Sequence, residues 1–333
     1  MKYLPHAAAA IAAVVLCTTA VRADDCKPLA LVQHLALSTS PDLRRLYVPV
    51  EIGGKPKELL LDTGAAVTMI DRSLADDLGL QTRDSPVRIF DLTGATSDRY
   101  VETSFTLGRL AFPKFQLQVG AQLQDPDEPG MAGLLGASFL TFFDISIDPA
   151  GKTLDLIRPD HCPNKVIFWP TTAIAMIPFT LDGGALIVDL KLDGRPIKAI
   201  LDTGASNSTL RINAAERFFD IKPGSPDAPV SGVLNSNERL TTYHHVFKTL
   251  DFDGVVISNL DVELIPDRVT REFNEKPTGS LIGVTPQSIS APMLIGMDVL
   301  RHTRLYISYK THMLYVTPPT GPAAAAPAPV PTK

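Results

Sequence analysis

The sequence predicts an all-β protein with short helices, built from two similar halves fused in one chain. The tripeptide Asp-Thr-Gly occurs twice, beginning at Asp62 and at Asp202, and each copy directly follows an aliphatic segment typical of a buried strand. The elements around the first copy recur in the same order around the second. With 333 residues, the chain is also long enough for about two domains.

Each half opens with a strand hairpin that leads into its Asp-Thr-Gly. In the first half an alternating strand reaches Ile52, Gly53-Gly54 forms the turn, and a second strand runs into Asp62. In the second half Asp193-Gly194 forms the equivalent turn, and the next strand runs into Asp202. The two aspartates are therefore predicted to occupy matching positions at the ends of matching strands.

After each Asp-Thr-Gly the same series of elements is expected. It consists of a short strand, a short helix, a polar hairpin, two apolar residues before a glycine, and a closing hairpin. From the helix onward, the first half places these at 71–80, 91–100, Gly136 and 144–157, and the second half at 211–220, 231–243, Gly296 and 304–316. The repeated order indicates an internal duplication, with the halves related by a pseudo-twofold axis.

The chain divides into five predicted segments. They are a signal peptide at 1–23, a first lobe at 24–158, an interlobe joint at 159–172, a second lobe at 173–317 and a disordered Pro/Ala-rich tail at 318–333. Between its Asp-Thr-Gly and its late glycine the second half is longer than the first. We expect the extra residues at Arg268–Gln287.

The composition excludes some classes of function. The chain is 45% hydrophobic and 20% charged, which is ordinary for a globular protein, and its formal net charge is −5. Because it carries no run of Lys or Arg, a nucleic-acid partner is not expected. Beyond the N-terminal segment no apolar run approaches membrane length, so no membrane span is expected in the mature chain.

The N-terminus has the features of an export signal. Lys2 provides a positive charge, Ala7–Leu16 is apolar, and Val21 and Ala23 are small enough for cleavage before residue 24. A membrane anchor is the alternative, but the apolar run is short for a span. A lipoprotein site at Cys17 is less favoured because a bulky leucine precedes it. The mature protein is therefore predicted to be exported, either to a periplasm or to the medium.

Two cysteines remain after cleavage, Cys26 and Cys162. An exported protein folds in a compartment that permits disulfides, so one bridge between them is predicted. The alternative is two unrelated free thiols.

The doubled aspartate predicts acid–base chemistry. Two carboxyl groups in close contact cannot both ionise easily, so one of them keeps a proton. If Asp62 faces Asp202, the ionised carboxylate can take a proton from a water held between them, and the protonated one can donate to a carbonyl oxygen. Hydrolysis would then need neither a metal nor a cofactor, and neither is expected.

The other loop residues are predicted to support the pair. The glycines allow a tight turn and close backbone approach, and the threonine hydroxyls can bond to the backbone of the opposite loop. The residues assigned to this support are Thr63, Gly64, Ala65, Gly136, Thr203, Gly204, Ala205 and Gly296.

This pattern resembles the retropepsin-like aspartic proteases, in particular exported bacterial members with two fused lobes. The resemblance rests on 62–65 with 134–136 and on 202–205 with 294–296, and it covers roughly Tyr47–Val316. It implies two retropepsin-like (acid protease) barrel lobes, each contributing one aspartate. It also implies a monomer whose lobes pair within one chain and an extended polypeptide as substrate.

The resemblance further implies hairpin flaps that close over the substrate. The residues assigned to the flap tips are Thr93, Gly94 and Ala95 in the first lobe, and Leu234, Asn235 and Ser236 in the second. Ordinary surface hairpins are the alternative.

The sequence departs from the family pattern at four positions. Retroviral members pair an aspartate after the Asp-Thr-Gly with an arginine after the late glycine, and this pair locks their dimer. Here Ala66 and Ser206 replace the aspartates, while Ala137 and Met297 replace the arginines. Covalent fusion of the lobes makes such a lock less necessary.

Two other features are assigned no function. The adjacent His244 and His245 would alternate along a strand and lack accompanying ligand spacing, so no metal site is expected there. The sequon at Asn207 lies beside the predicted catalytic turn, where a glycan would not fit.

The sequence thus predicts an exported aspartic endopeptidase. The rival is a non-catalytic peptide-binding protein on the same scaffold, which would hold an extended chain by strand addition without cutting it. An envelope structural protein is a weaker rival, because only the tail favours it.

Overall fold

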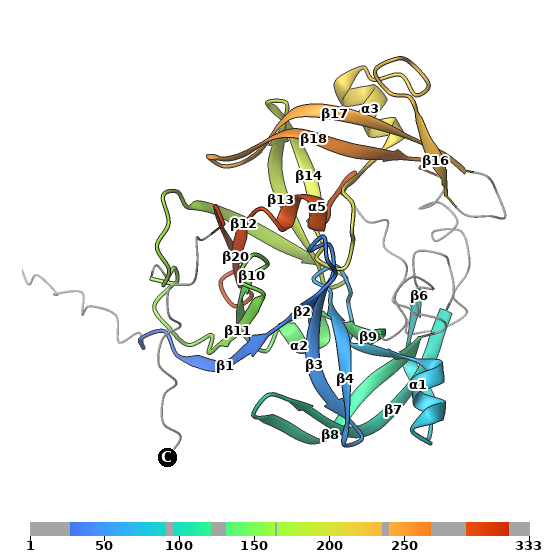
Figure 1. Cartoon of the computed structure of the whole chain (residues 1–333), viewed down its shortest axis with the longest axis vertical. Helices are drawn as coiled ribbons and strands as arrows, with labels where there is room; N and C mark the ends of the chain where they lie inside the picture. Colours follow the sequence, from blue (N-terminus) through green and yellow to red (C-terminus); the bar gives the residue numbers. More distant parts are fainter. Residues whose placement is uncertain are drawn as a thin grey trace, which may run out of the picture.

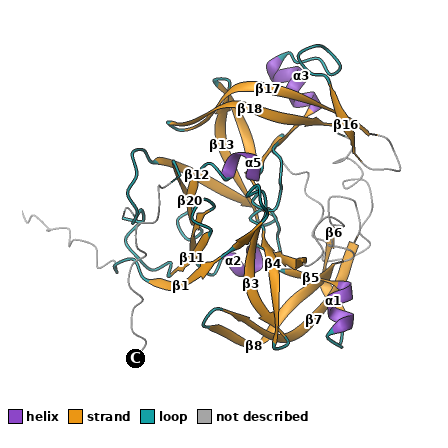
Figure 2. Ribbon diagram, in the orientation of Figure 1, coloured by secondary structure: helices purple, strands orange, loops and turns teal. Residues whose placement is uncertain are grey.

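The computed structural model describes residues 27–90, 96–120, 131–163, 165–234, 240–267 and 291–319. The chain forms two β-barrel lobes joined by a shared sheet, with few and short helices (Figures 1 and 2). The all-β, two-lobed fold class predicted from the sequence is confirmed.

The first lobe is a six-stranded closed barrel. Its strands in order around the barrel are β3 (Leu46–Ile52), β4 (Lys55–Leu61), β9 (Met131–Leu135), β5 (Met69–Asp71), β8 (Leu110–Gly120) and β7 (Thr96–Leu107), and β7 closes back onto β3. Outside the barrel lie β2 (Ser38–Thr39), β6 (Arg83–Phe90) and the helices α1 (Arg72–Asp77) and α2 (Ala137–Leu140).

The second lobe repeats this barrel element by element. Its strands in the same order are β13 (Ala185–Leu192), β14 (Arg195–Leu201), β19 (Met293–Ile295), β15 (Thr209–Arg211), β18 (Val255–Ile265) and β17 (Leu240–Phe252), and β17 closes onto β13. Outside the barrel lie β16 (Val230–Leu234) and the helices α3 (Ile212–Phe219) and α5 (Met297–Leu300).

Local sequence accounts for the elements that were predicted. In β3 the alternate residues Leu46, Val48, Val50 and Ile52 are buried, as the period of a half-buried strand requires. Helix α1 begins after Asp71, whose carboxylate accepts a hydrogen bond from the Ser73 amide and so caps the first turn. The closing hairpins of the two halves are also present, as β10 with β11 and as β20 with β21.

A six-stranded sheet joins the lobes. Its strands in order are β1 (Leu31–Ala36), β11 (Thr153–Ile157), β10 (Asp144–Asp148), β20 (Arg304–Ser308), β21 (Met313–Thr317) and β12 (Ala175–Asp182). The pseudo-twofold axis passes between β10 and β20, where Ile145 pairs with Ile307 and Ile147 with Leu305. Both central strands are buried along their whole length, which indicates that both faces of the sheet are covered.

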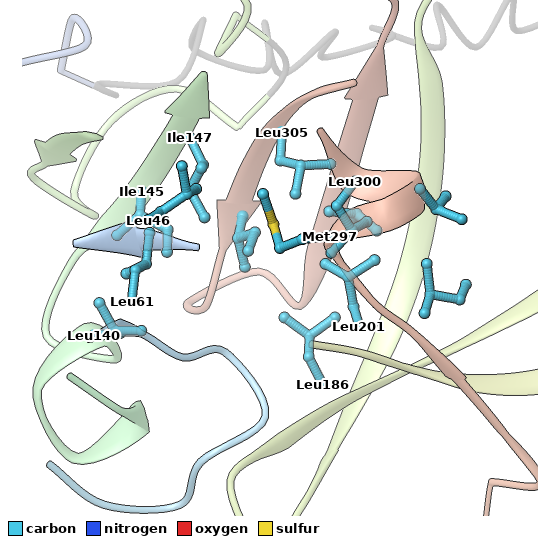
Figure 3. Close-up of a cluster of buried hydrophobic side chains, with 14 of the residues drawn as sticks. Leu46, Leu61, Leu140, Ile145, Ile147, Leu186, Leu201, Met297, Leu300 and Leu305 are labelled. Atoms are coloured by element: carbon cyan, nitrogen blue, oxygen red, sulfur yellow. The ribbon is translucent and has the colours of Figure 1, made fainter. Parts of the chain in front are cut away.

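One face of this sheet carries a core that is continuous between the lobes. Matching residues of the two halves, all fully buried, meet in a single cluster (Figure 3). The labelled members are Leu46, Leu61, Leu140, Ile145 and Ile147 from the first half and Leu186, Leu201, Met297, Leu300 and Leu305 from the second. The lobes are therefore held together by apolar burial, the dominant favourable term in folding.

The opposite face is covered by the interlobe joint. Val166 and Trp169 are buried against Tyr306 and Tyr315 in a second cluster. The Trp169 ring packs over the guanidinium of Arg304 at 3.9 Å, and its indole N–H donates to the Thr317 hydroxyl at 3.1 Å. The joint predicted at 159–172 is thus a packed layer.

Cys162 lies at the start of this joint and is disulfide-bonded. Its amide donates to the carbonyl of Lys27 at 3.0 Å. The residue that directly follows Cys26 in the chain therefore lies beside Cys162. Cys17 and Cys26 are both outside the described residues. The Cys26–Cys162 pairing therefore stays a prediction.

Candidate active site

The two Asp-Thr-Gly loops lie side by side, each at the end of its barrel strand. The Asp62 amide donates to the carbonyl of Leu135 in β9 at 3.1 Å, and the Asp202 amide donates to the carbonyl of Ile295 in β19 at 3.0 Å. Each aspartate is thus fixed where a hairpin strand meets a parallel neighbour, β4 beside β9 and β14 beside β19.

The threonines lock the two loops together. The Thr63 hydroxyl donates to the Leu201 carbonyl at 2.8 Å and accepts from the Thr203 amide at 3.1 Å. The Thr203 hydroxyl donates to the Leu61 carbonyl at 2.7 Å and accepts from the Thr63 amide at 3.1 Å. Both threonines are buried, so losing either hydroxyl would leave two backbone groups of the opposite lobe unsatisfied.

The glycines bring the opposite carboxyl group close. A Cβ placed on Gly64 would lie 2.5 Å from Asp202 Cγ, and one placed on Gly204 would lie 2.4 Å from Asp62 Cγ. Any other residue at either position would displace the facing carboxyl group. Glycine is required here for close approach.

The aspartates accept matching hydrogen bonds from their own loops. The amides of Gly64 and Ala65 donate to Asp62 Oδ1 at 2.9 and 2.8 Å, and those of Gly204 and Ala205 donate to Asp202 Oδ1 at 2.8 and 3.2 Å. The two carboxyl groups also share a hydrogen bond.

The environment raises the pKa of both aspartates. Burial is the main cause for each, and it raises the pKa of Asp62 well above its ordinary value together with the charge of Asp202. For Asp202 the loop amides, the hydrogen bond from Asp62 and the charge of Arg45 oppose the effect of burial on its pKa. The pair is thus arranged to hold one shared proton, and the proton affinity belongs to the pair.

The late glycines support the loops from behind. A Cβ on Gly136 would lie 2.4 Å from the Val67 carbonyl oxygen, and one on Gly296 would lie 2.6 Å from the Asn207 carbonyl oxygen. Gly136 and Gly296 also begin α2 and α5, the helices that pack behind the two Asp-Thr-Gly loops.

Sequence reasoning missed two hydroxyls in this support. The Gly136 amide donates to the Thr68 hydroxyl at 3.2 Å, and the Gly296 amide donates to the Ser208 hydroxyl at 3.0 Å. Both hydroxyl residues are buried. They occupy matching positions after the two aspartates, and this match was the signal that could have revealed them.

Backbone contacts occupy the positions where the retroviral lock is lost. The Ala137 amide donates to the Ala65 carbonyl and the Met297 amide to the Ala205 carbonyl, both at 2.8 Å. Each short helix is therefore attached to its Asp-Thr-Gly loop without a charged pair. These bonds hold each loop within its own lobe.

Arginines of both halves make further contacts between the lobes. Arg45 Nη1 donates to the Gly204 carbonyl at 2.6 Å, and Arg44 donates to the Asn207 side chain. Arg301 Nη1 donates to the Asp42 carbonyl at 2.7 Å. Sequence reasoning did not single out these arginines. The hydrogen bond from Arg44 also gives the Asn207 side chain a role as an acceptor.

The remaining predicted residues lie away from this pair or outside the described parts. Strands β6 with β7 and β16 with β17 form the two polar hairpins. Thr93, Gly94, Ala95, Asn235 and Ser236 are outside the described residues, as is Arg268–Gln287, while Leu234 is described only as the last backbone position of β16.

Neither histidine of the adjacent pair shares a ligand cluster. His244 Nδ1 lies 3.1 Å from Asp261 Oδ1, and His245 Nδ1 lies 2.7 Å from the Asp227 carbonyl. Within the described ranges, no group of three or more His, Cys, Asp or Glu side chains is placed to hold a metal ion. The helices in the same ranges are all too short or too polar to cross a membrane.

The family comparison agrees with this geometry. The family model described as aspartyl protease matches residues 48–139 and 188–299, together more than half of the chain. The aspartic proteinase from Irpex lacteus is similar in structure, with a TM-score of 0.49, 14% identity, and coverage of 86% of this chain and 97% of that one. Basic 7S globulin from soybean has a TM-score of 0.48, 12% identity, and coverage of 87% and 95%. A search of curated proteins found no match.

Proposed function

Because the chain belongs to the aspartyl protease family, we propose that it is an exported aspartic endopeptidase. In this proposal Asp62 and Asp202 hold a water between them and use it to hydrolyse peptide bonds. The observation that carries the proposal is the reciprocal threonine lock, which brings the two carboxyl groups into hydrogen-bonding contact.

The proposed reaction is general acid–base hydrolysis without a covalent intermediate. The ionised carboxylate takes a proton from the water as its oxygen attacks the peptide carbonyl carbon. The protonated carboxyl donates to the carbonyl oxygen, which gives a neutral tetrahedral intermediate. When the C–N bond breaks, the leaving nitrogen takes the proton held by the pair. A hydroxyl of the intermediate gives its proton back to the pair as the carbonyl re-forms, so the pair ends in its single-proton state.

The proposed substrate is an extended polypeptide. In support, β6 is the edge strand of the first-lobe sheet and β16 the edge strand of the second, and each belongs to a hairpin at the matching position. We propose that these hairpins act as flaps, which would exclude water from the site during reaction.

The proposed enzyme is a monomer of two lobes with the boundaries predicted above. Its proposed location, outside the cytoplasm, rests on the N-terminal 1–23 segment and agrees with the disulfide at Cys162. In this compartment the fused chain would carry a complete catalytic pair without a second copy.

The test is digestion of a peptide library by the mature chain, beside Asp62→Asn, Asp202→Asn and the double variant. The wild type should cleave, each single variant should lose cleavage, and the double variant should be no worse than either, because the two residues act as one unit. Binding of extended peptides by the wild type without cleavage would instead establish the non-catalytic alternative.

A further inference from the structure

The catalytic loops are nearly symmetric, but the charge beside them is not. Arg45 lies just before β3 of the first lobe, and its guanidinium reaches across to the catalytic loop of the second lobe. There Nη1 donates to the carbonyl oxygen of Gly204 at 2.6 Å. A permanent positive charge is therefore attached to the loop that carries Asp202.

This contact is connected to the Asp202 carboxyl group through a single peptide unit. The Gly204 carbonyl and the Ala205 N–H are the two ends of one amide, and the N–H donates to Asp202 Oδ1 at 3.2 Å. A cation bound at the amide oxygen draws electron density from the nitrogen and makes the N–H a stronger donor. Arg45 thus favours the negative charge on Asp202 through this hydrogen bond and also through space.

The Asp-Thr-Gly loop of the first lobe receives no such cation from the matching position of the second lobe. Leu46 and Leu186 are equivalent, so the residue that matches Arg45 is Ala185, whose side chain has no donor. The matching amide N–H, that of Ala65, donates to Asp62 Oδ1 at 2.8 Å. Bond length alone would therefore favour the negative charge on Asp62, and the Arg45 charge acts in the opposite direction.

The other charged groups near the pair do not cancel this asymmetry. Arg44 bonds to the Asn207 side chain, beyond the amides that face the carboxyl groups. Burial and the charges of Asp144 and Asp62 raise the pKa of Tyr309, which stays a neutral phenol. The charge of Asp202 raises the pKa of Asp62, whereas the charge of Arg45 lowers that of Asp202.

We propose that Arg45 assigns the two catalytic roles, making Asp202 the ionised base and Asp62 the carboxyl that holds the proton. Arg45 is a positioning residue for charge, because it acts through the Gly204–Ala205 amide. The catalytic consequence rests on the proposed proteolytic function, but the location of the proton can be measured without turnover.

The experiment titrates each carboxyl group alone in the mature chain by ¹³C-carboxyl NMR. Asp202 is observed in the Asp62→Asn variant, and Asp62 in the Asp202→Asn variant. The pKa of Asp202 should be the lower of the two. Adding Arg45→Gln should raise the pKa of Asp202 by about one unit while moving that of Asp62 by less than about 0.3 unit.

Two variants separate charge from structure. Arg45→Lys keeps the positive charge, so the pKa of Asp202 should stay close to the low value that it has with Arg45. Arg44→Gln removes a neighbouring charge and a contact between the lobes, but this charge lies beyond the amides that face the carboxyl groups. Both aspartate pKa values should therefore stay within about 0.3 unit of those measured with Arg44 present. Equal shifts of both aspartates in Arg45→Gln, no shift of either, or a lower pKa for Asp62 would overturn the assignment.

A kinetic measurement then separates this inference from the proposed function. In the wild type the Arg45 charge keeps the base Asp202 ionised down to lower pH. If the wild type cleaves peptides, Arg45→Gln should therefore move the acidic limb of the kcat–pH profile to higher pH by about one unit. A protein that shows the predicted titration but never cleaves would support the charge assignment and contradict the protease proposal. A protein that cleaves peptides but gives Asp62 and Asp202 the same pKa would support the protease proposal and contradict the charge assignment.

Discussion

Asp62 and Asp202 are chemically ordinary residues, and their surroundings make them unusual. Each faces a glycine of the opposite loop, accepts two amide hydrogen bonds and lies against the other carboxyl group. The burial that raises the pKa of the pair also means that ionising the pair lowers the stability of the folded state.

The first prediction at this scale concerns stability. Because burial raises the pKa of Asp62, the folded state binds more protons than the unfolded chain at pH values between the unfolded pKa near 4 and the folded one. Stability contributed by the protonated pair is therefore lost as the pH rises through that interval. Asp62→Asn should stabilise the mature protein by about 1 kcal/mol at pH 7, and by much less below pH 4.

Thermal unfolding at the two pH values measures this effect. Asp189→Asn is the control, because Asp189 is an exposed residue paired with Lys198 and should change stability little at either pH. A lower melting temperature for Asp62→Asn at pH 7 would contradict the prediction.

The second prediction at this scale concerns Ala65 and Ala205, the residues that follow the two catalytic glycines. A serine hydroxyl at either position could donate to the adjacent carboxylate, which would favour the ionised form and lower the pKa values of the pair. In the proposed mechanism activity requires the single-proton state, so the double variant Ala65→Ser with Ala205→Ser should have its optimum at lower pH. A pH–rate profile decides this, and an unchanged or more alkaline optimum would count against it.

At the scale of elements, each lobe divides its tasks among short pieces of structure. In the first lobe β4 carries the aspartate, β9 fixes its amide and α2 supports the loop, and β14, β19 and α5 do the same in the second. In the proposed function, the hairpins β6–β7 and β16–β17 are the elements assigned to contact with substrate.

The flap assignment gives the prediction at this scale. Replacing 93–97 with a tight two-residue turn should impair peptide cleavage while leaving the melting temperature nearly unchanged, because a flap closes over substrate and does not support the core. Cleavage rates and thermal unfolding of the same variant test both parts. Equal activity would remove the flap assignment for the first lobe.

At the scale of the whole molecule, the two lobes behave as one packed body. A continuous apolar core covers one face of the joining sheet, and the interlobe joint covers the other. Polar groups are also buried on the face that the joint covers. His161 lies 2.8 Å from both Asp144 and the Tyr306 hydroxyl, and Arg304 pairs with Asp148 at 3.2 Å.

The joint should therefore matter for stability. Trp169→Ala should cost about 3 kcal/mol or more of unfolding free energy, because it removes a buried ring and exposes Arg304 and the tyrosines beneath it. Denaturant unfolding measures the loss. Phe142→Ala is the control, since Phe142 is 61% exposed and should change stability little. Equal effects of the two variants would show that the joint is not a structural layer.

The disulfide is the other prediction at this scale. We expect Cys162 to be bridged to Cys26, which would fasten the N-terminal strand to the joint and contribute about 2–4 kcal/mol. Peptide mapping of the unreduced mature protein tests the pairing. Two free thiols would contradict it.

Much of this architecture was readable from local sequence. The alternation in β3, the glycine turns and the repeated Asp-Thr-Gly predicted the hairpins, the duplication and the positions of Asp62 and Asp202, because each depends on residues close together in the chain. The long hairpins β7–β8 and β17–β18 were not predicted, because exposed residues in their strands interrupt the alternation of apolar and polar positions.

The sequence by itself therefore determined the two halves, the catalytic candidates and the loops that carry them. Only the tertiary structure decided how the surroundings of the two aspartates differ. Arg45 and Gly204 are 159 positions apart, and nothing near either residue marks the other as its partner. Repetition along the chain reveals what the lobes share, whereas the charge that distinguishes Asp202 from Asp62 comes from one unrepeated side chain that reaches the second lobe only when both barrels pack on their common sheet.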